Sequence, residues 1–290
     1  MVANTLSSST ELSEKIKDLT QNGERAIAFL PVGCIEQHGP YLPLETDSLI
    51  SKHIAYDLAE RISENGYGSS VFPTIDYTPT QTNANYCGTI SVENDVFRNY
   101  FKQVCHSLLR HSFDGIVIVS GHGSVDSILK EVAFWLVNEQ YSAGSKLIKP
   151  VLVLSIFECS LGIEEVFQQR PGRHADWREF LFLYKILGES YFTEERLNEI
   201  KIFNNRNIFH HDSSIIYGVP MEYRSVEGVI GEPLPILNKD WGRLSEKLWD
   251  ITIDGMFKRL KNELEQFYVN KYHVNRYYMA KEKVVQCKDE

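Results

Sequence analysis

The chain has 290 residues, of which 43% are hydrophobic and 24% are charged, and its formal net charge is -9. This length and composition are typical of a globular protein with a sizeable core. The negative charge argues against a nucleic acid or an anionic membrane as partner, because both need a basic protein face. No apolar run reaches the roughly 18 residues that a membrane span needs.

The N-terminal region and the cysteines indicate a cytoplasmic protein. Residues 1–10 are rich in Ser and Thr, lack the apolar region of a signal peptide, and predict a disordered or weakly docked lead-in. The five cysteines are odd in number, widely spaced and without a C-x-x-C pair, which favours a reducing compartment over a disulfide framework. We therefore expect histidines and carboxylates, not thiolates, to hold any metal.

Short apolar runs alternate along the chain with segments of helical periodicity. Strands are predicted over residues 26–30, 70–77, 115–120 and 151–156. Helices are predicted over residues 11–19, 47–64, 93–111, 125–141, 176–187 and 240–267. This alternation predicts an α/β fold with a mainly parallel sheet and helices on both faces. We expect one domain over residues 1–290 with its core at about 24–267, and the tail 268–290 receives no assignment.

The first concentration of polar side chains with metal-binding capacity follows the strand predicted at 26–30. Glu36 and His38 are two residues apart, a spacing that places both side chains on one side of an extended segment. Asp47 stands at the start of the helix predicted at 47–64, where its carboxylate could bridge two ions. Loops after buried strands are where open α/β sheets bind their ligands.

A second group follows the strand predicted at 115–120. His122 lies between two glycines, which let the backbone approach a ligand closely. In a parallel sheet both loops lie at the same edge, so we expect His122 to join Glu36, His38 and Asp47. Two carboxylates and two imidazoles suit Zn²⁺, Mn²⁺ or Fe²⁺. Taken singly, each residue also fits a structural role, as a loop ion pair, a helix cap or a strand-end histidine.

These motifs resemble the creatininase family, the creatinine amidohydrolase-like metal hydrolases. The resemblance runs over about residues 26–242 and rests first on the long motif over 33–47. The shorter matching motifs are Gly88-Thr89-Ile90-Ser91, Ser120-Gly121-His122-Gly123, His174-Ala175 with Glu179, and Gly228-Val229-Ile230-Gly231-Glu232-Pro233.

The resemblance implies a doubly wound α/β fold and a centre of one or two divalent ions, with Zn²⁺ as the first choice. It implies a hydrolase that cleaves a C–N bond of a small non-peptide amide, cyclic amide or formamide through a metal-activated water. Carried over, Glu36, Asp47 and His122 would hold one ion, and His38 and Asp47 the other. The family also implies a homo-oligomer, often a hexamer, acting on a small-molecule substrate.

Two further residues take chemical roles through the resemblance. Creatininase carries a Glu two residues after the second-motif His, and here that position is Ser124. Glu179 is our candidate for the missing ligand, with Asp176 next, and for a catalytic role, although a surface helix carboxylate is the plain alternative for Glu179. His174 is our candidate for the proton shuttle, because a histidine titrates near neutral pH. A structural histidine before a helix is the alternative.

Two departures from the family pattern concern the substrate pocket. Trp177 replaces a family Glu and could stack on a flat substrate, although it could equally pack in a helix. Asn83 stands where the family has a His, and we assign it to the substrate pocket with Trp177.

Two other functions stay open at this point. Cys34, four residues before His38, and Cys87 allow a Cys-dependent hydrolase. The departures at Ser124, Asn83 and Trp177 allow a binding or scaffold subunit without catalysis. The run His210-His211-Asp212 has the composition of a metal site, but adjacent histidines on a polar loop are usually solvated.

Overall fold

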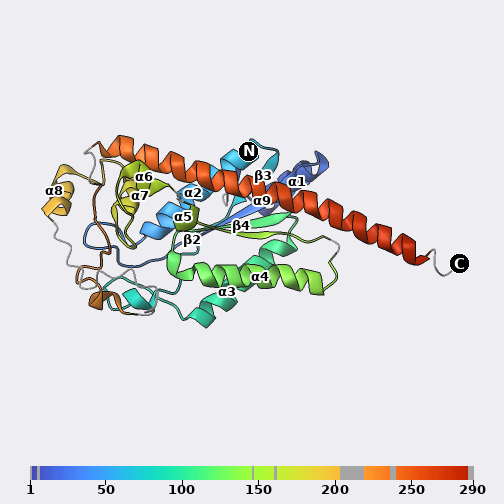
Figure 1. Cartoon of the computed structure of the whole chain (residues 1–290), viewed down its shortest axis with the longest axis horizontal. Coiled ribbons are helices and arrows are strands. Elements are labelled where there is room, and N and C mark those ends of the chain that lie inside the picture. Colours follow the sequence, from blue (N-terminus) through green and yellow to red (C-terminus); the bar gives the residue numbers. More distant parts are fainter. Residues whose placement is uncertain are drawn as a thin grey trace.

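The computed structural model describes residues 2–4, 7–145, 147–159, 162–202, 219–235 and 240–286, so the His210-His211-Asp212 run lies outside the described residues. Its centre is a five-stranded sheet with the strand order β1-β3-β2-β4-β5, in which every pair is parallel (Figure 1). The strands are β1 (Val2–Asn4), β2 (Arg25–Val32), β3 (Tyr67–Val71), β4 (Gly115–Ser120) and β5 (Val151–Ser155).

Helices connect the strands and follow the last of them. The α-helices are α1 (Ser9–Gln21), α2 (Thr46–Ser63), α3 (Asn94–Arg110), α4 (Asp126–Ser142), α5 (Ile156–Cys159), α6 (Ile163–Phe167), α7 (Trp177–Leu187), α8 (Glu194–Ile202) and α9 (Trp241–Gln286). Three short 3-10 helices are η1 (Gln81–Asn83), η2 (Gly123–Val125) and η3 (Met221–Tyr223). The α/β class, the mainly parallel sheet and the helices on both faces are confirmed.

The alternation of side chains along β2 builds two separate cores. Ile27 and Phe29 face a core shared with α2, α7 and α9. Ala28 and Leu30 face the opposite core, which α1, α3 and α4 complete. Because successive strand residues point to opposite faces, one buried strand serves both layers. Figure 1 shows α3 and α4 on one side of the sheet, with α2, α7 and α9 on the other.

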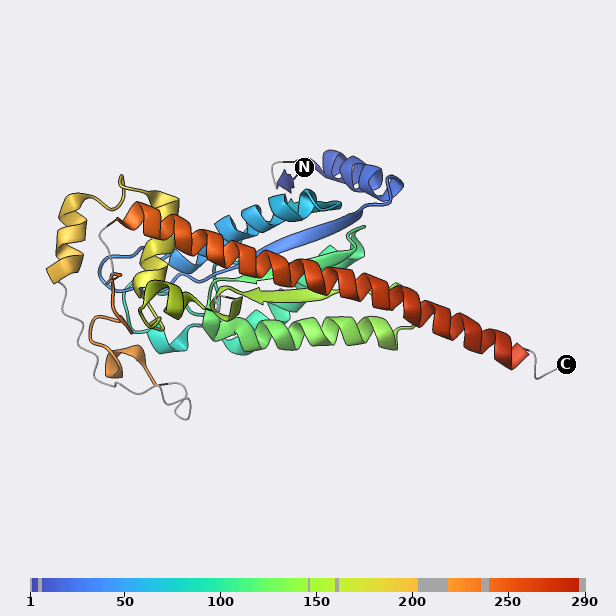
Figure 2. The same ribbon diagram turned by 45° about the horizontal axis from the view of Figure 1, so that its top comes forward.

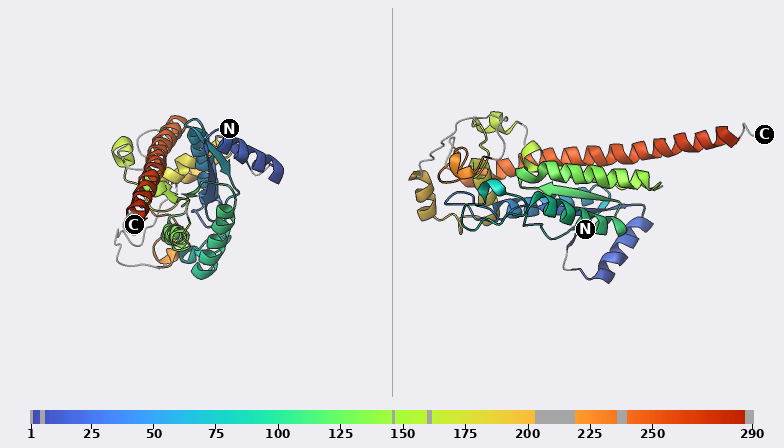
Figure 3. Two further views of the ribbon diagram at one scale, coloured as in Figure 1. Left: turned by 90° about the vertical axis from the view of Figure 1, so that its right-hand side faces the viewer. Right: turned by 90° about the horizontal axis from the view of Figure 1, so that it is seen from below.

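The C-terminal helix α9 crosses the face that α2 and α7 cover. Its buried side chains include Leu248, Met256 and Leu264. Beyond them the helix extends well past the rest of the chain, as Figures 2 and 3 show. The helix predicted at 240–267 is therefore confirmed, and it continues to Gln286 within the tail that the sequence left unassigned. Within the described residues, no helix has both the length and the apolar character required to cross a membrane.

Other differences from the predicted elements lie at the margins of the sheet. Part of the expected lead-in forms β1, which pairs with β3 and extends the sheet by one strand. Strand β3 lies at 67–71 instead of 70–77. Pro73 explains the early end, because proline cannot donate a ladder hydrogen bond. The extent of the single domain stays a prediction.

Candidate metal centre

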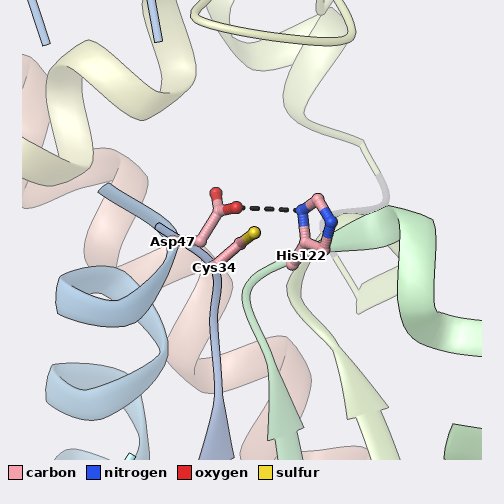
Figure 4. Close-up of side chains that lie close together, drawn as sticks. All are labelled: Cys34, Asp47 and His122. Carbon is pink, nitrogen blue, oxygen red and sulfur yellow. Dashed lines mark ion pairs between the residues drawn. The ribbon is translucent and has the colours of Figure 1, made fainter. Parts of the chain in front are cut away.

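Two glycines bring the ends of β2 and β4 against the first turn of α2. The two strands pair in parallel through their last residues, so the segments that follow them leave the sheet side by side. A Cβ on Gly33 would come within 2.4 Å of the Ser48 backbone, and one on Gly121 within 2.4 Å of the Asp47 carbonyl oxygen. Only glycine permits this approach. Figure 4 shows the result: Asp47 on α2 faces His122 beyond β4.

Asp47 lies at the middle of the site and presents one carboxylate oxygen to each of two histidines. Its Oδ1 is 3.1 Å from His38 Nε2, and its Oδ2 is 2.9 Å from His122 Nδ1. The carboxylate is buried, and among the described residues these two histidines balance its two oxygens. A buried carboxylate is costly unless cations or hydrogen-bond donors satisfy it.

Three buried imidazole rings share one arrangement, in which one ring nitrogen lies against a backbone carbonyl and the other nitrogen faces the carboxylates. The anchoring pairs are His38 Nδ1 with Glu36 O at 3.1 Å, His122 Nε2 with Pro79 O at 3.1 Å, and His174 Nε2 with Gln37 O at 2.7 Å. A carbonyl oxygen only accepts, so the anchored nitrogen carries a proton. The opposite nitrogen is thereby the one available to a metal, and such anchoring is usual for metal-binding histidines.

The side chain of Gln37 supports this assignment for His174. Gln37 Nε2 lies 3.0 Å from His174 Nε2, but its two hydrogens go to Asn83 Oδ1 at 2.9 Å and to Gly228 O at 3.1 Å. His174 Nε2 is therefore left as a donor to the Gln37 carbonyl. Its Nδ1 faces Glu36 Oε1 at 3.6 Å.

Glu36 and Glu179 supply the remaining carboxylates from opposite sides of Asp47. Glu36 Oε1 lies 3.4 Å from His122 Nδ1, and Glu36 Oε2 accepts hydrogen bonds from Asn83 Nδ2 at 2.8 Å and from the Thr80 hydroxyl. Glu179 Oε2 lies 3.8 Å from His38 Nε2 and accepts from the Ala175 N–H at 2.6 Å. Each carboxylate keeps one face toward a histidine while fixed protein donors orient it.

The charges of this cluster shift every histidine in it. Burial lowers the pKa of His38, but Asp47, Glu179 and Glu36 outweigh it and raise that pKa to about 10. Burial also lowers the pKa of His122, but the charges of Glu36 and Asp47, with Glu36 the stronger, outweigh it and raise that pKa to about 9. Burial raises the pKa of Glu179. Burial and the neighbouring His38 charge lower the pKa of His174 to about 4. The carboxylates thus favour positive charge at the ring nitrogens of His38 and His122 that face Asp47.

The donor set fits a pair of divalent ions that share Asp47. The ligand atoms of His38, Asp47 and Glu179 all lie within 4.8 Å of one another. Glu36 Oε1 and Asp47 Oδ2 both approach His122 Nδ1, at 3.4 and 2.9 Å, and the ligand atoms of Glu36, His38 and His174 also lie within 4.8 Å of one another. The shared Asp47 carboxylate and the anchored imidazoles are the features that such ions would satisfy.

The structure thus brings together Glu36, His38, Asp47, His122 and Glu179, the five metal ligands predicted from the sequence. None of these residues is more than 4% exposed. His174 joins them, with its ring centroid 4.4 Å from that of His38. Ser124 lies at the wall of the adjoining cavity, and the carboxylate that approaches His38 comes from Glu179.

The two residues predicted to contact substrate have different surroundings. Asn83 lines the cavity beside the cluster and donates to Glu36, so it orients a carboxylate. Trp177 lies in the core: its side chain is 0% exposed, its ring packs 5.1 Å from that of Phe167, and its Nε1–H donates to Arg170 O. The prediction that Trp177 stacks on a substrate is therefore wrong, because the helix turns this side chain inward.

The cysteine alternative receives little support from the geometry. Cys34 is fully buried, with its Sγ 4.0 Å from Thr78 O. Burial raises the pKa of its thiol, and the nearby charges of Glu36 and Asp47 raise it further. A nucleophilic cysteine needs the thiolate, which these surroundings disfavour.

Sequence reasoning missed Thr80, whose hydroxyl orients Glu36, and Gln37, whose backbone carbonyl holds His174. Thr80 precedes η1 and Asn83 ends it, a three-residue spacing that puts both side chains on Glu36. Gln37 lies between the predicted ligands Glu36 and His38. In an extended segment its side chain points away from theirs, and this alternation was the available signal.

A cavity of about 570 Å³ opens over the cluster. Its lining includes Glu36, Asp47, His122, His174 and Glu179, so the predicted ligands face a space large enough for a small molecule.

Comparisons with known proteins agree with this geometry. The chain matches the family model "Creatininase: Creatinine amidohydrolase" over residues 12–256. It is 30% identical over 120 residues to a mycofactocin precursor peptide peptidase of Mycobacterium ulcerans (strain Agy99), covering 40% of this chain and 48% of the relative. It is 26% identical over 156 residues to a creatinine amidohydrolase of Pseudomonas putida, covering 52% of this chain and 58% of the relative. The chain thus spans about half the length of the curated relatives that it matches.

Solved structures share the fold at low sequence identity. A mutant creatininase of Zn-Zn type superimposes with a TM-score of 0.70 at 16% identity, covering 91% of this chain and 98% of the other. A creatininase described as the Mn form gives a TM-score of 0.70 at 17% identity, covering 91% and 99%. The family model extends over most of the sequence, from the region of α1 into α9. This chain belongs to the creatininase family.

Proposed function

We propose that this chain is a metal-dependent hydrolase that cleaves a C–N bond of a small amide, cyclic amide or formamide. The observation that carries the proposal is Asp47, whose two oxygens face His38 and His122 beneath a cavity of about 570 Å³. A carboxylate placed in this way suits a shared ligand of two ions. The names of the relatives, an amidohydrolase and a peptidase, agree with hydrolysis of a C–N bond.

In this proposal Glu36, Asp47 and His122 hold one ion, and His38, Asp47 and Glu179 hold the other. Two divalent ions supply an activated water and polarise the substrate carbonyl. Zn²⁺ is the first choice, with Mn²⁺ and Fe²⁺ as alternatives, because mixed imidazole and carboxylate donors accept all three. Creatininase structures of Zn-Zn and Mn type exist at similar folds.

His174 is placed to move the proton that amide hydrolysis requires. Its Nε2–H is held by the Gln37 carbonyl, so Nδ1 is the atom that can accept a proton beside the cavity. The lowered pKa of about 4 keeps the ring neutral at physiological pH, and it also makes the ring a weaker base than a free imidazole, so a proton accepted there is readily passed on. From the same atom the proton can pass to the leaving nitrogen. The Glu179 carboxylate completes this side of the site.

A peptide amide is the second candidate substrate. One relative is named a mycofactocin precursor peptide peptidase, and the two-metal chemistry makes no distinction between a peptide and another amide.

Oligomeric state and location rest on the resemblance and the cysteine pattern: we propose a cytoplasmic homo-oligomer, with a hexamer as the first assembly to test.

The direct test is hydrolysis by the purified protein of creatinine, an N-formyl amide, a small lactam and a dipeptide. We expect turnover of at least one, loss of turnover on chelation, and recovery with Zn²⁺ or Mn²⁺. Activity that resists chelation and falls with iodoacetamide would instead favour a Cys34 hydrolase. Tight metal binding without turnover of any amide would favour a binding or scaffold subunit without catalysis.

A further inference from the structure

The cavity over the metal centre is lined by three arginines as well as by the predicted ligands. They are Arg173, Arg178 and Arg224. Arg178 is neutralised within the protein, because its Nε lies 2.9 Å from Asp176 Oδ2 and its Nη2 donates to Gly172 O at 2.8 Å. Arg178 therefore maintains the cavity wall, and Arg224 is the arginine whose charge bears on what the cavity attracts.

Arg224 is half-buried beside another cation. Burial lowers the pKa of its guanidinium, and the nearby charge of Arg173 lowers it further. Among the described residues, no carboxylate lies within ion-pair distance of Arg224. A guanidinium stays protonated in such surroundings, so its partial desolvation is unfavourable until an anion approaches.

The carboxylates that line the same cavity already have partners. Asp47, Glu36 and Glu179 line it, but each faces a histidine of the metal cluster. They are more than 90% buried, and fixed donors orient Glu36 and Glu179. The carboxylates of the cavity thus already have partners in the metal cluster.

The segment that carries Arg224 is held firmly in place. The backbone N–H of Arg224 donates to Met221 O at 2.8 Å, which closes the turn after η3. The Tyr86 hydroxyl donates to Ser225 O at 2.8 Å and ties this turn to the loop that carries Asn83. On the other wall, the Arg173 N–H donates to Ile230 O at 2.7 Å. Both arginines therefore arise from backbone fixed to the same frame as the metal ligands.

We propose that Arg224, assisted by the charge of Arg173, binds an anionic group of the substrate while the amide lies at the metal centre. This inference rests on the proposed function and deepens it, because it assigns the substrate class as an amide that carries a carboxylate or a phosphate. A guanidinium fork binds either group through paired hydrogen bonds. The neutral amide alone would leave the Arg224 charge without a partner.

The test measures binding of three matched acetamides to the zinc-loaded protein by calorimetry, with KM replacing Kd for any that is turned over. The probes are N-acetylglycine, its neutral analogue N-acetylglycinamide, and the phosphate of N-acetylethanolamine. We expect one anionic probe to bind about tenfold or more tightly than the neutral one, as charge-assisted hydrogen bonds produce. The probe that carries the preference distinguishes a carboxylate substrate from a phosphate one.

Substitutions locate the preference. Arg224→Gln is expected to reduce it to near unity and Arg173→Gln to reduce it in part, with the zinc content of both unchanged. Arg110→Gln is the matched control, because Arg110 is exposed at the end of α3, at the opposite edge of the sheet. If Arg224→Gln folds poorly, Arg224→Lys keeps the charge and is expected to retain only part of the preference.

Equal binding of all three probes by the unmodified protein would overturn the inference, as would a preference that survives Arg224→Gln. Failure of the proposed function has a different signature. In that case the Arg224-dependent preference would persist while no amide of the hydrolysis panel is cleaved. Hydrolysis of neutral amides without any anion preference would overturn the inference alone.

Discussion

At the scale of single residues, Asp47 joins the two halves of the centre, and its replacement should affect both. Asp47→Asn removes the charge that both predicted ions would share. We expect zinc affinity to fall at least 100-fold, more than the loss typical of outer-shell changes. Competition with a chromophoric chelator measures this affinity. Asp254→Asn, an exposed carboxylate paired with Arg61, is the matched control and should leave it unchanged. Equal zinc affinity in Asp47→Asn would contradict the assignment.

The raised pKa values of His38 and His122 predict that metal binding releases protons. With pKa values of about 10 and about 9, both rings hold a second proton at neutral pH in the metal-free protein. A metal must displace those protons, so affinity should rise as pH increases toward about 9 and fall as pH decreases. Calorimetry in buffers of different ionisation enthalpy should report release of about two protons. Zinc uptake without proton release would count against this protonation state.

The ligands could be predicted from sequence because four of them follow two strands of one parallel sheet. Glu36, His38, Asp47 and His122 needed only that edge rule and the strand assignments. Trp177 was misjudged because its direction depends on how α7 packs, which its residue type does not reveal. Arg224 gave no signal, since a turn arginine acquires meaning only when folding places it in the cavity.

At the scale of elements, close approach of β4 to α2 sets the geometry of the centre, and Gly121 permits it. In Gly121→Ala the new Cβ would meet the Asp47 carbonyl oxygen at 2.4 Å, so the strand end or the helix must shift. We expect the free energy of unfolding to fall by about 1–3 kcal/mol and zinc affinity to fall with it. Denaturant unfolding of the metal-free protein and chelator competition measure the two effects.

The control for this substitution is Gly242→Ala. Gly242 lies in the first turn of α9, where the nearest atom to an added Cβ is 3.8 Å away. Alanine in a helix is favoured over glycine, so stability should stay the same or rise slightly. Equal effects of the two substitutions would contradict a steric role for Gly121.

The loop that contains η1 orients Glu36 through Thr80 and Asn83. Thr80→Val keeps the side-chain shape but removes the hydroxyl donor to Glu36 Oε2. We expect a 10- to 100-fold loss of metal affinity, as for other groups that orient a ligand, with little change in secondary structure. Thr20→Val, on α1, removes a hydroxyl that donates to Ile16 O and should leave metal affinity unaltered. A Thr80→Val protein with full affinity would show that Asn83 alone orients Glu36.

At the scale of the whole molecule, α9 completes one of the two cores. Met256 on this helix is fully buried in the core that α9 shares with α2 and α7, whereas Lys258 is exposed on the same helix. Met256→Ala should lower the free energy of unfolding by about 2–5 kcal/mol through the cavity that it leaves, and Lys258→Ala should change it little. Denaturant unfolding compares the two. Equal losses would mean that α9 is not packed as described.

The overall architecture was predictable because strand and helix periodicities differ strongly in the central part of the chain. The strand at 115–120 was predicted to the residue, as its run Gly115-Ile116-Val117-Ile118-Val119-Ser120 is buried on both faces. Strand β1 was not, because three residues carry too little pattern and depend on β3 for pairing. Segments that depend on distant partners are the ones that local sequence leaves open.

Anomalous X-ray scattering from crystals of the zinc-loaded protein is the most direct test of a two-ion centre that shares Asp47. We expect two peaks in the cluster, each roughly 2.0–2.2 Å from its ligand atoms. One should lie against Glu36, Asp47 and His122, and the other against His38, Asp47 and Glu179. A single peak without Asp47 as a ligand, or no peak among these side chains, would contradict it.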